Sequence, residues 1–272
     1  LLERTHGKAG AERPVRPGGR SVRVRRLAIR TAQDVEIRTS PLVQMAGEAQ
    51  RPTRWWLSWP VAAAIIIVGA LVGDAVGSAI LGDPNRTDTL DQFKDFFTFG
   101  CSLLFLFLWM RLKERRRFSS VGFRGARAVP KLLAGFAIGA AMMAAAAAIP
   151  LITGDLTDGG STHTNTGASA LLPILALVLI FYWQASTEES ITRGYMLQTT
   201  GRQTGAWFAV LGTSIFFAAI HVTTDPVALL NTALYAALAS FVALGQGNLW
   251  LICGIHAGWN YVQGNIFGVP VS

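Results

Sequence analysis

Residues 170–200 read ALLPILALVLIFYWQASTEESITRGYMLQTT, an apolar run that is interrupted by two acids and an arginine. A helix needs about 20 mainly apolar residues to cross the hydrocarbon core of a bilayer, and this run is long enough. Ionisable residues such as Glu188, Glu189 and Arg193 are costly inside a membrane, so they usually face a partner or a wet cavity. The run therefore predicts a membrane helix that carries a functional site.

Six further apolar runs lie on either side of this one. Over the chain of 272 residues 51% are hydrophobic and only 15% are charged, which is more apolar than a typical soluble domain. The sequence therefore predicts an all-α, polytopic transmembrane helical bundle of about seven spans, with six to eight as the range. The other runs are 57–81, 96–111, 130–152, 205–222, 227–244 and 248–267.

The chain is strongly basic before the first run. Residues 1–54 hold 12 Lys and Arg against five Asp and Glu, which accounts for +7 of the net charge of +8. This segment has no sustained periodicity and is interpreted as a disordered tail. A basic segment before a first span is ordinary, so nucleic acid is not expected as a partner. Because the chain opens at Leu1 and its first methionine is Met45, residues 1–44 are a candidate non-native extension.

The charges between the runs predict an orientation. The connection from 111 to 131 contains eight Lys and Arg, whereas residues 153–167 contain none. Basic loops are enriched on the cytoplasmic side, so this connection and the N-terminus are expected in the cytoplasm. Seven spans then place the C-terminus outside. The richness in Ala, Gly and Arg favours a bacterial plasma membrane.

The two acids of the fourth run are expected to have different surroundings. Glu189 and Arg193 are spaced i,i+4 with the acid nearer the N-terminus, which favours an ion pair on one helix face. Successive residues project about 100° apart, so Glu188 points elsewhere and is the candidate base. The alternative is that the span ends near Ala185 and that all three charges lie at a cytoplasmic helix end.

Two later histidines and an amide add to these groups. His221 ends the fifth run, and His256 and Asn260 share one face of the seventh run at i,i+4. At a rise of 1.5 Å per residue, Glu188 and Asn260 each lie roughly 18 Å from the cytoplasmic ends of their helices. His221 lies roughly 24 Å and His256 roughly 12 Å from the corresponding ends. All four are therefore expected in one layer of the membrane.

Three motifs, taken together in order and spacing, give a family resemblance. The chain resembles the CAAX-prenyl-endopeptidase and bacteriocin-processing (CPBP, or Abi) family of intramembrane proteases, which carries these motifs on successive core helices. The motifs read Glu188-Glu189-x-x-x-Arg193, Phe217-x-x-x-His221 and His256-x-x-x-Asn260, with Gly194 after the arginine and Gly247-Asn248-Leu249-Trp250 before the last helix.

The resemblance implies hydrolysis of a peptide bond within the bilayer. Glu188 matches the catalytic glutamate of the family and would activate a water together with His221. His256 and Asn260 would hold the oxyanion, and the acid–arginine pair beside Glu188 would support the geometry. A low-dielectric site and preorganised donors suit this chemistry.

The resemblance also implies a division of the chain and its partners. Residues 55–168 are expected to form N-terminal transmembrane helices, and residues 169–268 the CPBP/Abi-like catalytic core. The expected partners are the lipid bilayer and a peptide or protein substrate.

Zinc is the alternative to a metal-free mechanism. The ligands would be His221 and His256 with either Glu188 or Glu189. A catalytic zinc needs three protein ligands and a separate base, so either Glu189 would have to leave Arg193 or Glu188 would have to serve as both ligand and base. The His-Glu-x-x-His pattern of many zinc proteases is also absent. This ligand count favours glutamate-dependent hydrolysis with no required cofactor.

Other classes of function could use the same residues. Acids, histidines and an arginine within a bundle also suit a proton-coupled transporter. A non-catalytic immunity or scaffold member of the family is a further alternative. Asp74 and Asn231 are polar residues near span ends that match no family motif.

Overall fold

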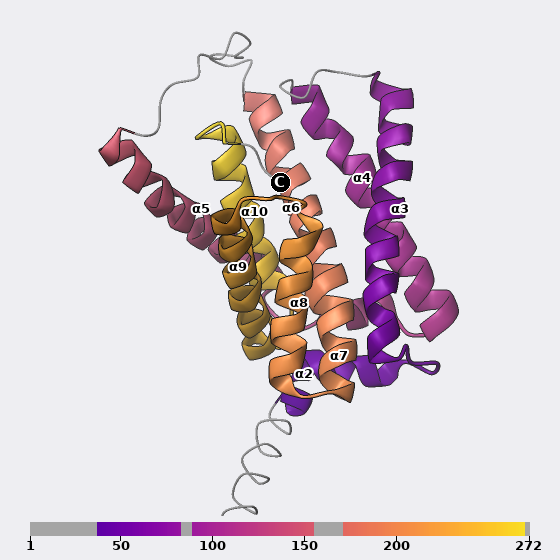
Figure 1. Cartoon of the computed structure of the whole chain (residues 1–272). Coiled ribbons are helices and arrows are strands. Elements are labelled where there is room, and N and C mark those ends of the chain that lie inside the picture. Colours follow the sequence, from indigo (N-terminus) through magenta and orange to yellow (C-terminus); the bar gives the residue numbers. More distant parts are fainter. Residues whose placement is uncertain (1–36, 83–88, 155–170, 270–272) are drawn as a thin grey trace, which may run out of the picture.

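The computed structural model describes residues 37–82, 89–154 and 171–269, and every regular element in these ranges is a helix (Figure 1). Five helical stretches are long and apolar enough to cross a membrane. The all-α, polytopic bundle predicted from the sequence is therefore confirmed. The five are Trp55–Leu81 (α3), Gln92–Glu114, Ala128–Thr153 (α5), Leu171–Gln203 and Pro226–Gln246 (α9).

Two of these stretches contain a change of helix type. The second joins α4 (Thr89–Leu108) to the π-helix η2 (Trp109–Glu114). The fourth joins α6 (Leu171–Glu189), the π-helix η5 (Ser190–Leu197) and α7 (Gln198–Gln203).

Each of the seven predicted runs contains a helix, but two of the helices are short. They are α8 (Ala206–Ile220) with 15 residues and α10 (Trp250–Asn265) with 16 residues. At 1.5 Å per residue each is roughly 23 Å long, which is less than the hydrocarbon thickness of about 30 Å. Of the seven predicted runs, five thus contain a full-length candidate span and two contain a shorter helix.

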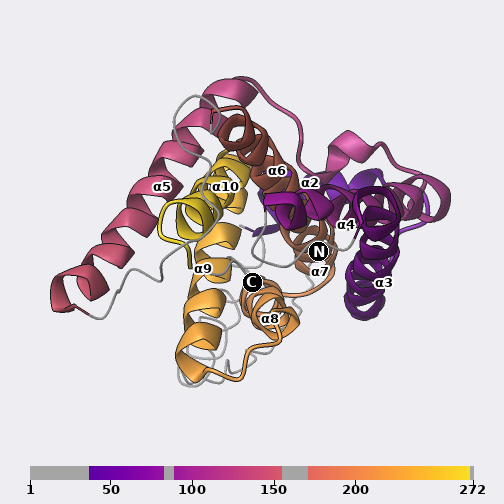
Figure 2. The ribbon, with the colours of Figure 1, turned by 90° about the horizontal axis from the view of Figure 1, so that it is seen from above.

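The helices form two flanks around α6. Helices α3 and α4 pack together on one side, and α5 packs on α10 on the other, while α6 contacts both α4 and α10 (Figure 2). Helix α8 packs on α9 in front of α6 (Figure 1). Of the three helices that carry the motifs, α6 contacts α10 directly, and α8 contacts the π-helix η5 that continues α6.

The close packing of α5 on α10 depends on glycines. A Cβ at Gly135 or Gly139 of α5, or at Gly254 or Gly258 of α10, would collide with backbone atoms of the opposite helix. Small residues allow membrane helices to approach closely, and the spacing of four residues in both helices keeps the glycines on one face. These contacts fix α10, and with it His256, against the rest of the bundle.

We expect Gly139→Leu to destabilise the protein by about 1–3 kcal/mol, because the new side chain must push α5 away from the backbone of Ile255. Ala137→Leu is the matched control, because Ala137 lies on the exposed face of the same helix. The measurement is the free energy of unfolding in mixed detergent micelles. Equal stability of the two variants would contradict this packing.

The N-terminal segment differs from its prediction as a disordered tail. Residues 37–54 are ordered and include α2 (Pro41–Gln44) and the 3-10 helix η1 (Met45–Glu48). Leu42 and Val43 are fully buried, and the Ser40 hydroxyl donates to the Leu244 carbonyl of α9 at 3.0 Å. The interpretation of 1–54 as disordered is therefore wrong for 37–54, because a few apolar side chains in a short helix can be buried without any long periodicity. Residues 1–36 lie outside the described part of the chain.

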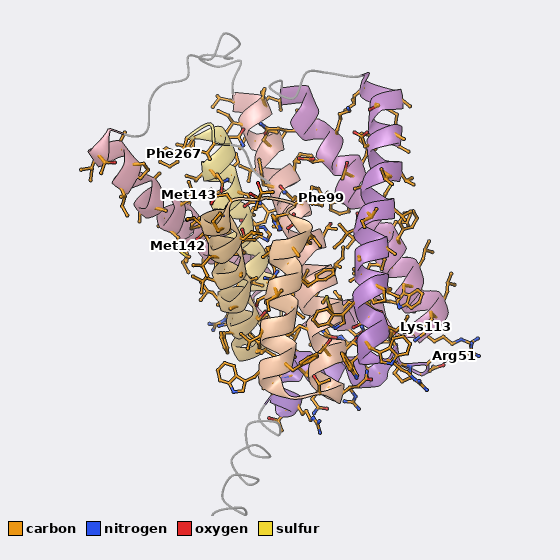
Figure 3. All side chains as sticks on the ribbon, in the orientation of Figure 1. Arg51, Phe99, Lys113, Met142, Met143 and Phe267 are labelled. Atoms are coloured by element: carbon orange, nitrogen blue, oxygen red, sulfur yellow. The ribbon has the colours of Figure 1, made fainter. Side chains whose placement is uncertain are left out.

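The basic connection and the ordered N-terminal segment lie at the same end of the bundle. Lys113 donates from Nζ to the Arg51 carbonyl at 3.1 Å, and Figure 3 labels both residues at this end. The Gln203 side chain at the end of α7 donates to the Thr53 carbonyl at 2.8 Å. This agrees with the relative placement that the loop charges predict. The charge-free loop 153–167 falls almost entirely outside the described residues, as does the expected domain boundary at 168.

An ion pair ties η1 to the loop after the 3-10 helix η3 (Phe118–Val121). Arg124 binds Glu48 through both terminal nitrogens, and its Nη2 lies 2.8 Å from Glu48 Oε2. The hydrogen bonds from Arg124, helped by nearby arginine charge and opposed by partial burial, hold the pKa of Glu48 below its ordinary value of 4.5. A carboxyl group with a lowered pKa in the folded state stabilises the fold above its unfolded pKa and loses this effect as the pH falls through the folded pKa.

We therefore expect Glu48→Gln to destabilise the protein by about 0.2–1 kcal/mol at pH 7, since the pair is partly exposed and screened by solvent. The difference from the wild type should vanish as the pH falls below the folded pKa of Glu48. Thermal unfolding in detergent from pH 7 to pH 3 measures it. A constant difference across this range would count against the ion pair.

Candidate functional site

The charged stretch of the fourth run lies inside a continuous helix. The helix extends from Leu171 to Gln203, and the side chains of Glu189 and Arg193 are 0% and 1% exposed. The helix itself therefore does not end near Ala185. Both charged side chains are instead surrounded by the bundle.

The helix changes from α to π immediately after the two acids. Two hydroxyl groups of the π segment bond to backbone carbonyls of the preceding turn. Ser190 Oγ donates to the Ser186 carbonyl at 2.5 Å, and Thr192 Oγ1 donates to the Glu188 carbonyl at 2.7 Å. Such bonds from Ser and Thr loosen a helix locally. Short π segments occur often at functional sites, and this one begins at Ser190.

Glu189 joins two of the three motifs. Its Oε1 accepts from Arg193 Nη1 at 3.3 Å, as the i,i+4 spacing predicts, and also from His256 Nδ1 at 2.9 Å. A carboxylate is an acceptor, so the bond to His256 fixes the proton on Nδ1 and leaves Nε2 facing away from Glu189. The contact between Glu189 and His256 was not predicted from the sequence.

Arg193 is held by three groups besides Glu189. It donates to the Ala236 carbonyl of α9 at 3.1 Å and to Thr192 Oγ1 at 2.8 Å. Its guanidinium carbon lies 4.4 Å from the ring centroid of Phe217, within the range of a cation–π interaction. Arg193 thus connects the π-helix η5 to α8 and α9, and the phenylalanine of the second motif has a structural role.

Glu188 faces a different direction, as its position one residue before Glu189 predicts. Its Oε2 lies 3.8 Å from His256 Nε2, and its Oε1 accepts from the Gln184 side chain at 3.3 Å. Its side chain is 14% exposed, whereas Glu189 is completely buried. Glu188 is therefore the more accessible acid of the two. Gln184 lies four residues before it and was missed, because an isolated glutamine in an apolar run gives little signal.

His221 lies at the C-terminal end of α8 and is oriented by its own helix. Its Nδ1 lies 2.6 Å from the Phe217 carbonyl, and its ring centroid lies 4.6 Å from that of Phe217. A carbonyl oxygen accepts only, so Nδ1 carries the proton and Nε2 of the neutral ring is free to accept.

Two cavities meet at His221. One, of about 270 Å³, lies among α8, α9 and α10 and is lined in part by His221, His256 and Asn260. The other, of about 230 Å³, lies among α3, α4, α6 and α8 and is lined in part by His221 and Glu188. The structure thus brings together the four residues that the sequence proposes as catalytic. Phe99, which lines the second cavity, is labelled in Figure 3 beside α6 and α8.

The side chains of the site offer few free donor atoms for a metal ion. Within the described ranges, no group of three or more His, Cys, Asp and Glu side chains is arranged to hold a metal ion. Both nitrogens of His256 face carboxylates, and Nδ1 of His221 is bound to a backbone carbonyl. The arrangement therefore does not fit the three-ligand set of a catalytic zinc.

The site and fold together define a class of protein: an integral membrane protein of helices with a buried acid–histidine site. Residues 170–262 match the family model described as type II CAAX prenyl endopeptidase Rce1-like. This match covers about a third of the chain, includes all three motifs, and supports the resemblance to the CPBP family of membrane proteases that was inferred from them. No curated protein and no solved structure gives a significant match.

Proposed function

We propose that the protein is an intramembrane endopeptidase that hydrolyses a peptide bond with a water activated by Glu188. The observation that carries this proposal is that the two adjacent acids have different surroundings. Glu189 is buried and bound by Arg193 and His256, whereas Glu188 is partly open and lies beside His221 and the same His256.

In the proposed reaction Glu188 accepts a proton from water while the water oxygen attacks the substrate carbonyl carbon. His221 Nε2 accepts a hydrogen bond from the same water and orients it. The oxyanion then receives hydrogen bonds from a protonated His256 Nε2 and from the Asn260 amide. The carbon–nitrogen bond breaks as Glu188 passes the proton to the leaving amine, so that atoms and charge balance.

The neighbouring groups support this chemistry by holding its parts in place. Glu189 fixes the His256 ring through Nδ1, and Arg193 holds Glu189. Donors that are already oriented need no rearrangement when charge develops on the substrate, which is the main source of oxyanion stabilisation. We also propose that the end carrying the basic connection faces the cytoplasm.

The experiment that tests the function is a comparison of membrane peptides in cells that produce the intact protein or Glu188→Ala. Peptides cleaved only by the intact protein identify substrates, which are then presented to purified protein in detergent. We expect cleavage that is lost in Glu188→Ala, His221→Ala and His256→Ala. Substrate uptake driven by protons without cleavage would indicate a transporter, and the absence of cleavage and uptake a scaffold.

We further expect cleavage to continue after removal of divalent metals. The reason is that the proposed base and oxyanion donors are all side chains of this chain. Activity is measured after dialysis against a strong chelator, with and without added zinc. A loss of at least about 100-fold that zinc restores would support a metal mechanism instead.

A further inference from the structure

The two cavities that meet at His221 have different walls. The cavity beside Glu188 contains the apolar side chains of Ile66, Ala70, Phe99, Ile191 and Ile220. The cavity among α8, α9 and α10 contains a set of polar side chains beyond the proposed catalytic groups. These include Thr223, Asn231, Thr232, Tyr235 and Gln263.

Four hydroxyl groups line the cavity beside Glu188, those of Thr98, Ser102, Thr187 and Thr192, and the last three already donate to carbonyls of their own helix. Ser102 Oγ donates to the Thr98 carbonyl at 3.1 Å, and Thr187 Oγ1 donates to the Trp183 carbonyl at 3.0 Å. Each proton is thus already used within its own helix. A ligand meets mainly hydrocarbon in this cavity, whose volume of about 230 Å³ suits a single large apolar side chain.

Asn231 gives the other cavity its distinctive character. It lies on α9 among apolar residues, its side chain is exposed, and it lines the cavity together with His256 and Asn260. The structure gives the Asn231 amide no hydrogen bond to any described residue. An amide offers both donors and an acceptor, which is the complement of a peptide backbone.

The start of α9 fixes the position of Asn231 in the cavity. Asp225 caps the helix by accepting from the Val227 amide at 2.8 Å, and Pro226 occupies the first turn, where it is well tolerated. Asn231 follows within the next turn and a half. The amide is therefore presented from a defined helix and not from a loop.

We propose that the cavity among α8, α9 and α10 is a substrate subsite in which Asn231 binds the peptide backbone, while the cavity beside Glu188 takes an apolar side chain. This proposal rests on the proposed function. The substrate class is a peptide in which the cleaved bond joins an apolar residue to a polar one. Such a bond lies where a chain passes from hydrocarbon to a wetter environment.

Asn231→Leu tests the polar subsite, because leucine keeps the size and removes both kinds of hydrogen bond. We expect KM for a cleaved peptide to rise about 3- to 10-fold, with a smaller change in kcat. Leu230→Ala is the control, since Leu230 is the exposed neighbour on the same helix and lies outside both cavities. An unchanged KM in Asn231→Leu would overturn the assignment.

Ala70→Phe tests the apolar subsite by filling it from α3. Four peptides are compared, with apolar–polar, polar–apolar, apolar–apolar and polar–polar residues across the bond. We expect the wild type to cleave one of the two peptides with an apolar and a polar residue better than the other three peptides. We also expect Ala70→Phe to weaken the cleavage of that peptide more than it weakens the cleavage of an analogue in which alanine replaces the apolar residue. Equal cleavage of all four peptides would overturn the proposal.

Binding to Glu188→Gln separates this inference from the proposed function. A fluorescent peptide that binds this variant, and binds about 3- to 10-fold more weakly when Asn231→Leu is added, supports the subsite even if the wild type cleaves nothing. If the wild type cleaves the peptide but Asn231→Leu does not change its binding, the proposed function stands and the assignment of the subsite is overturned.

Discussion

Replacing Glu188 by glutamine is expected to lower kcat by at least about 100-fold, because general acid–base catalysis by one positioned group typically contributes between about 10²- and 10⁴-fold. Glutamine has the same shape and can still accept the hydrogen bond from Gln184, so the helix should keep its structure. The amide cannot take a proton from water at neutral pH. KM should change much less than kcat.

Glu48→Gln is the matched control for this prediction. It makes the same chemical change at the end of the bundle that carries η1, where the acid is paired with Arg124. Its kcat should equal that of the wild type. If Glu188→Gln kept wild-type activity while it remained folded, the assignment of Glu188 as the base would be wrong.

Arg193→Met is expected to destabilise the protein by about 3–5 kcal/mol, which is the largest stability effect that the site predicts. The methionine removes the cation from a completely buried Glu189 and removes the donor to the Ala236 carbonyl. Without its partner, the buried carboxylate bears a desolvation cost that His256 alone does not offset. The free energy of unfolding in mixed micelles measures the effect.

A second change distinguishes lost charge pairing from lost packing. In Arg193→Met with Glu189→Gln no uncompensated carboxylate is left, so part of the stability should return. Arg117→Met is a control at an exposed arginine. If the double variant were as unstable as the sum of its single changes, the ion pair would not be the cause.

Much of the fold could be predicted from the sequence, because a membrane helix is recognised by the length of its apolar run. The limits of the fourth helix and the pairing of Glu189 with Arg193 follow from spacing within one helix. The lengths of α8 and α10 were less predictable, since apolar residues continue beyond the helix ends. The order of residues 37–54 was missed because it depends on a few buried contacts with α7 and α9.

The site was predictable in its members but not in its contacts. Helical periodicity places Glu188 and Glu189 on different faces, yet it cannot indicate which helix each face meets. The bond from His256 to Glu189, and the stacking of Arg193 on Phe217, depend on how α10 and α8 are packed. Asn231 matched no motif, and only its position in a cavity beside His256 made it a candidate for binding substrate.

The most direct test of the central claim is a single turnover in water enriched in ¹⁸O. With a substrate identified by the peptide comparison, direct attack by a water activated at Glu188 predicts one ¹⁸O atom in the new carboxyl terminus and none in the protein. Label in the Glu188 side chain would show covalent attack by the carboxylate, and would contradict the account.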